Sequence, residues 1–161
     1  MRILALVVAL VLAASAGTWA WPAPSREVAR AFDAPATPYG PGHRGIDIAA
    51  EAGAPVVAVA DGTVRFAGMV AGRPVVSIDH GAGLVSSVEP VEPSVRTGDP
   101  VARGDPIGTL LAGHADAEGR PSARIHLGAR LHGAYVDPLP LLGVERPVLL
   151  PLGAPKTGRA H

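Results

Sequence analysis

Glycine and proline interrupt this chain too often for long helices to form. Its 161 residues include 20 Gly and 17 Pro, and turn pairs such as Asp61-Gly62 and Gly72-Arg73 separate short runs rich in β-branched residues. Runs of this kind predict antiparallel strands joined by hairpins. We therefore expect an all-β fold. The expected strands cover residues 56–60, 63–70, 74–78, 84–88, 107–112 and 123–130.

The first residues have the form of a secretory signal. Arg2 precedes an unbroken apolar run from Ile3 to Ala14, and small residues then allow cleavage after Ala16 or after Ala20. We assign residues 1–20 to a signal peptide and expect a secreted or cell-envelope protein. An uncleaved membrane anchor is the alternative, because the uncharged stretch is nearly as long as a bilayer span.

Three further segments follow. Residues 21–41 form a Pro-rich arm, 42–143 a single β domain, and 144–161 a flexible tail. The arm leaves room for one turn of helix at 27–32. We expect Val28 and Phe32 to pack the arm against a sheet edge, since covering segments protect unpaired edges.

Charge and cysteine content exclude several classes of function. The chain has 14 basic and 14 acidic residues, so there is no electrostatic case for a nucleic acid or an anionic membrane as its partner. It has no Cys, which excludes disulfides, thiolate metal ligands and a cysteine nucleophile. We expect a monomer.

Three residues could together hold a metal ion. His43 and Asp47 lie four residues apart, and His126 follows much later. Positions i and i+4 of an extended strand share a face, so the first two side chains can converge. Two imidazole nitrogens and one carboxylate oxygen leave a fourth position open, as in catalytic zinc sites. With six His in the chain, this spacing alone is a common chance match.

A longer series of residues is more specific. His43-x-Gly45-x-Asp47 is followed by the Asp79-His80-Gly81 turn, by a glycine-spaced series from Val95 to Gly108, and by His126 and Arg130. In this order, residues 43–138 resemble the lysostaphin/LytM-type zinc endopeptidases of peptidoglycan. The resemblance implies a small antiparallel β-sandwich of the duplicated hybrid motif type. It also implies Zn²⁺ held by His43, Asp47 and His126, and a peptidoglycan peptide as substrate.

The glycine-spaced series also occurs in biotinyl and lipoyl carrier domains. Those domains attach their prosthetic group to a lysine at a hairpin tip. The only lysine here, Lys156, lies in the tail, so the inventory of residues excludes that alternative.

The chain departs from the family at two positions. The family has two further histidines beside the metal, and the resemblance places them at Pro90 and Arg124 of this chain. Arginine cannot accept a proton, but Arg124 shares a face with His126 and is a candidate oxyanion stabiliser. His114 is the candidate general base. It could equally be an exposed loop residue, or the fourth ligand of a purely structural zinc site.

These observations predict a secreted zinc metalloendopeptidase that cuts peptidoglycan cross-link peptides slowly. The alternative is a non-catalytic domain that binds cell wall or regulates another cell-wall hydrolase. We interpret His80 as a turn residue and His132 as a surface residue, neither of them a ligand.

Overall fold

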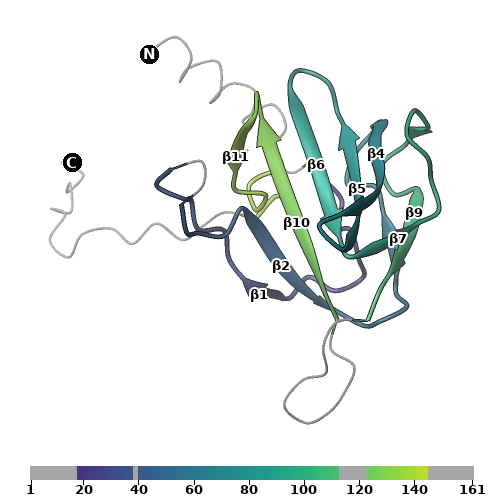
Figure 1. Ribbon diagram of the computed structural model, residues 1–161, viewed down its shortest axis with the longest axis horizontal. Coiled ribbons are helices and arrows are strands. Elements are labelled where there is room, and N and C mark those ends of the chain that lie inside the picture. Colours follow the sequence, from purple (N-terminus) through teal and green to yellow (C-terminus); the bar gives the residue numbers. More distant parts are fainter. Residues whose placement is uncertain (1–17, 38–39, 113–122, 145–161) are drawn as a thin grey trace, which may run out of the picture.

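The computed structural model describes residues 18–37, 40–112 and 123–144, and this part of the chain folds into strands arranged in two sheets (Figure 1). The strands are β1 (Val28–Arg30), β2 (Gly45–Ala50), β3 (Pro55–Val57), β4 (Gly62–Val70), β5 (Arg73–Asp79), β6 (Leu84–Glu89), β7 (Val91–Pro93), β8 (Pro100–Val101), β9 (Pro106–Leu110), β10 (Ala123–Leu131) and β11 (Ala134–Val136). Within these residues, no helix is long and apolar enough to cross a membrane.

The larger sheet carries the candidate site. Its strand order is β1-β2-β10-β6-β5-β4-β8, and β11 pairs with the end of β10. The smaller sheet has the order β3-β9-β7. All these pairings are antiparallel. Strand β10 is therefore a central strand, with β2 on one side and β6 on the other (Figure 1).

Alternating residues of the large sheet point into the core. In β2, Ile46 and Ile48 are fully buried, and in β10 the same holds for Ile125 and Leu127. Buried residues of the small sheet, such as Ile107, belong to the same apolar cluster. The two sheets thus form a sandwich, and the other side chains of β2 and β10 must face outward because successive side chains of a strand alternate.

The expected all-β sandwich is confirmed, with some differences in its elements. Strands β4, β5, β6, β9 and β10 lie within about one or two residues of the predicted runs. The first predicted strand is shorter, since β3 ends at Val57 although Ala58 and Val59 remain buried. The short strands β7, β8 and β11 were not predicted, because two or three residues carry too little periodicity to be recognised.

The helical turn expected in the arm is wrong. Residues Val28–Arg30 form β1, which pairs antiparallel with β2 and is itself the edge strand of the sheet. An extended arm satisfies its backbone groups against an edge that would otherwise be unpaired, whereas a single helical turn satisfies few of them. The predicted packing is confirmed, because Val28 and Phe32 both lie against the core.

The last two residues assigned to the signal peptide, Trp19 and Ala20, are part of the fold. Trp19 is buried, its N–H donates to the Leu141 carbonyl at 3.0 Å, and the Ala20 N–H donates to Val59 at 2.6 Å. Residues 1–17, 38–39, 113–122 and 145–161 lie outside the described residues, so most of the predicted signal, His114 and nearly all of the tail do too. The proposed segment boundaries stay predictions.

Candidate metal centre

Strand register brings the three predicted ligands together. Asp47 of β2 lies directly opposite His126 of β10, and both occupy outward positions between fully buried neighbours. His43 precedes β2 and is held by a two-way bridge to the arm, in which it exchanges backbone hydrogen bonds with Asp33 at 2.7 and 3.0 Å. The core therefore sets two ligands and the arm sets the third.

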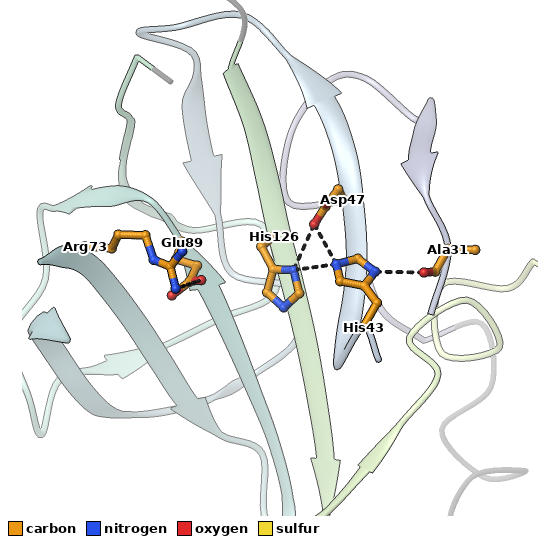
Figure 2. Close-up of polar contacts among 6 residues, drawn as sticks. All are labelled: Ala31, His43, Asp47, Arg73, Glu89 and His126. Atoms are coloured by element: carbon orange, nitrogen blue, oxygen red, sulfur yellow. Dashed lines mark hydrogen bonds and ion pairs between the residues drawn. The ribbon is translucent and has the colours of Figure 1, made fainter. Parts of the chain in front are cut away.

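The ligand atoms form a small triangle (Figure 2). The Oδ1 atom of Asp47 lies 2.9 Å from His43 Nε2 and 2.9 Å from His126 Nδ1, and the two ring nitrogens are 3.2 Å apart. Ligands at about 2.0–2.1 Å from a tetrahedral zinc ion lie about 3.3 Å apart. The triangle is thus close to the size of one face of such a site.

The protonation pattern also fits a cation. His43 Nδ1 lies 2.7 Å from the Ala31 carbonyl, which can only accept, so Nδ1 carries the proton and the Nε2 of a neutral ring is left as an acceptor. That acceptor faces the Asp47 carboxylate, a second acceptor. A metal ion between these two acceptors would bind both of them. Backbone carbonyls commonly orient ligating histidines in this way.

Gly45 makes room for the His126 ring. A Cβ atom at Gly45 would lie 2.7 Å from Nε2 and 2.8 Å from Cε1 of the His126 ring. Contacts below 3.0 Å require something to move. The glycine of the H-x-G-x-D motif therefore provides the space in which the third ligand lies.

Two of the three ligands are partly exposed. His43 is buried, while the side chains of Asp47 and His126 are 18% and 27% exposed. A groove of about 800 Å³ runs over the outer face of the large sheet, and His126 is part of its lining. A ligand in this groove approaches the centre past His126.

Glu89 is a site residue that sequence reasoning did not place. It ends β6 directly opposite His126, on the side of β10 away from Asp47. It lines the groove and pairs with Arg73 at 3.4 Å (Figure 2). The sequence does contain a signal for its orientation: Glu89 alternates with the buried residues of β6, as Val85 and Ser87 do, so its side chain faces outward.

The remaining candidates are placed as follows. Arg124 is exposed on the outward face of β10, two residues from His126, but it does not line the groove. Its role and that of His114 stay predictions. His132 is exposed in the β10–β11 turn. Arg130 lies opposite Tyr135 in the last hairpin.

His80 is a structural histidine. Its Nδ1–H donates to the Asp61 carbonyl at 2.8 Å, the Ser86 hydroxyl donates to its Nε2 at 2.8 Å, and its ring lies 5.3 Å from that of Trp19. Burial lowers the pKa of His80, which favours this neutral tautomer. The only cluster of metal-ligating side chains among the described residues is that of His43, Asp47 and His126.

Comparison with known proteins gives consistent matches. Residues 41–138 match Peptidase family M23. An uncharacterised protein of Mycobacterium tuberculosis is 48% identical over 127 residues, which are 76% of this chain and 50% of that protein. The chain thus spans about half the length of this relative.

Solved structures show the same fold. A zinc-containing peptidase from Vibrio cholerae superposes with a TM-score of 0.62 at 22% identity, over 82% of this chain and 41% of that one. The catalytic domain of lysostaphin from Staphylococcus simulans superposes with a TM-score of 0.59 at 20% identity, over 72% and 91%. Such low identities support a likeness of fold.

Proposed function

Because the chain belongs to peptidase family M23, we propose that it is a secreted zinc metalloendopeptidase that cuts the cross-link peptides of peptidoglycan. The observation that supports this most strongly is the triangle of ligand atoms, with sides of 2.9, 2.9 and 3.2 Å, beside an open groove. A closed structural zinc site would need a fourth protein ligand.

Each of the three residues would supply one ligand atom to the metal. His43 would hold the metal through Nε2, because Ala31 fixes its tautomer, Asp47 through Oδ1 and His126 through Nδ1. Zinc in such a site polarises a carbonyl group and lowers the pKa of water toward about 7. The groove lined by His126 would hold the peptide.

Hydrolysis also needs a proton acceptor. Arg124 cannot serve, and proline has no side-chain base to offer at position 90. Two acids among the described residues lie directly opposite His126 in the strand register: Asp47, which is a ligand, and Glu89, which lines the groove. We propose that Glu89 accepts a proton from the attacking water. His114 is the alternative candidate for this role.

Two measurements test this proposal. Protein purified without chelator should contain about one zinc per chain, and less than a tenth of an equivalent would refute the metal site. Glu89→Gln should lower turnover on cross-linked peptidoglycan about 100-fold or more, because a general base contributes about 10²–10⁴-fold. Bound zinc should not change.

Matched variants separate the two candidate bases. Glu92→Gln alters an exposed acid of the neighbouring strand β7 and should leave turnover unchanged. His114→Ala should reduce turnover about 100-fold, instead of Glu89→Gln, if the histidine is the base. A loss of zinc in His114→Ala would make the site structural.

Two residues favour a second candidate function. The positions of the family's non-ligand histidines are Pro90 and Arg124 here. The alternative is therefore a non-catalytic domain that binds cell wall or regulates another hydrolase. Zinc binding without hydrolysis of any cross-link type would favour this alternative.

A further inference from the structure

The groove beside His126 is cationic although the chain as a whole is neutral. Four arginines and two acidic residues line it, whereas the sequence has equal numbers of basic and acidic residues. The charged lining residues are Arg44, Arg65, Arg73, Arg130, Asp79 and Glu89. The net charge of the lining is therefore positive, which favours an anionic ligand.

The floor of the groove has a regular arrangement. Gly128 of β10 lies opposite Ser87 of β6, and Ser87 lies opposite Ser77 of β5. Ser77 and Ser87 line the groove, and Gly128, which has no side chain, shares their outward phase and continues the row across the strands. Because their side chains are small, the row is a trough that an extended peptide can occupy.

Different chemistry lies on the two sides of this trough. His126 and Arg130 are each two residues from Gly128 on β10, in opposite directions, and share its face. Two residues of a strand span about 6.6 Å. A peptide in the trough therefore has the metal ligands on one side and Arg130 on the other, at similar distances.

Arg130 is held in place but has no acidic partner among the described residues. Its guanidinium lies over the Tyr135 ring at 5.0 Å, and that of Arg44 lies over the same ring at 5.8 Å. The ion pairs in the described part of the chain do not include Arg130. A guanidinium oriented by an aromatic ring keeps its paired N–H donors available for a carboxylate.

We propose that the groove selects an anionic peptide, in which a carboxylate next to the scissile bond binds Arg130 while the scissile carbonyl lies at the metal centre. This inference rests on the proposed peptidase function, which it makes more specific. Apolar residues such as Phe66, Val70 and Val85 also line the groove. Such walls suit the methyl groups of a peptide better than they suit a polyphosphate.

Binding to the full-length, zinc-loaded chain tests the proposal. The probes are two peptidoglycan stem peptides, one with free carboxylates and one with these carboxylates converted to carboxamides. Affinity is measured by titration calorimetry, and mass spectrometry checks that the peptides stay intact. We expect the free-carboxylate peptide to bind about fivefold more tightly or better, as for a well-oriented exposed ion pair.

Three variants test whether Arg130 causes the preference for the free-carboxylate peptide. Arg130→Gln should abolish it while zinc content stays unchanged, and Arg130→Lys should keep part of it, which also shows that the position tolerates substitution. Arg96→Gln changes an exposed arginine in the loop between β7 and β8, away from the groove, and should leave the preference intact.

The outcomes are distinct. A preference below twofold, no binding of either peptide, or a preference that survives Arg130→Gln would overturn the inference. Tighter binding of tripolyphosphate than of the free-carboxylate peptide would make the groove a phosphate site and would also overturn it. Preference without cleavage supports the inference and contradicts the peptidase function, whereas cleavage without preference does the reverse.

Discussion

The burial of Trp19 leads to a prediction about where the mature chain begins. The sequence allows cleavage after Ala16 or after Ala20, and the second choice would remove Trp19. This side chain is only 3% exposed and belongs to the core cluster. We therefore expect the exported protein to retain Trp19.

The expected cost of losing Trp19 is large for a domain of this size. Truncating a buried Trp to Ala typically costs about 3–5 kcal/mol, out of a total stability of about 5–15 kcal/mol. Removing residues up to Ala20 also removes the backbone bonds to Leu141 and Val59, worth about 1 kcal/mol each. Together these losses amount to about 5–7 kcal/mol, so the shortened chain should melt about 15–20 °C lower.

Three purified chains test this reasoning. A chain that starts at Gly17 is compared with one that starts at Trp21 and with the longer chain carrying Trp19→Ala, by thermal unfolding followed by circular dichroism. Trp21→Ala is the matched control, because Trp21 is only partly buried and should matter less. If all chains melt within about 3 °C of one another, Trp19 is not a structural residue. Mass spectrometry of the exported protein then identifies its first residue.

Three further outcomes can be measured. Asp47→Ala should reduce bound zinc below about a tenth of an equivalent by metal analysis, because two imidazoles alone are a poor site. The double variant Val28→Ala/Phe32→Ala should weaken zinc binding about tenfold in competition with a chelator while the domain stays folded, since it loosens the arm that orients His43. Because the pKa of His80 is lowered below 6.5 in the fold, the unfolded chain binds the proton more readily, and stability should fall as pH falls below about 6.5. Denaturant titrations should show this slope reduced in His80→Gln.

The sequence predicted those features that depend on local pattern. Hairpin strands were found because Gly-containing turns separate β-branched runs, and β10 was found because its core positions alternate with polar ones. The ligands His43, Asp47 and His126 were found through the resemblance, and the structure brings their ligand atoms together. The strands are encoded within a few residues of their positions, whereas the ligand set needed the whole series over residues 43–138.

Features that depend on register could not be predicted in the same way. Glu89 faces His126 because β6 pairs with β10 at one particular offset, and a shift of a single residue would turn its side chain to the other face. The same holds for the row of Gly128, Ser87 and Ser77. Net charge was likewise no guide to the groove, because the sheet collects arginines from several strands on one face while acids elsewhere balance the total.

The arm shows why a domain boundary drawn from composition can divide a functional site. Its Pro-rich sequence has no periodicity, yet the Ala31 carbonyl fixes the tautomer of His43 and the Asp33 backbone holds that residue in place. A carbonyl is present at every residue, so no side-chain pattern could have revealed this role. Since a ligand with the wrong tautomer offers the metal an N–H instead of a lone pair, the affinity of the centre depends on a segment that contributes no ligand. A minimal domain starting at His43 should therefore bind zinc more weakly than the chain that includes the arm.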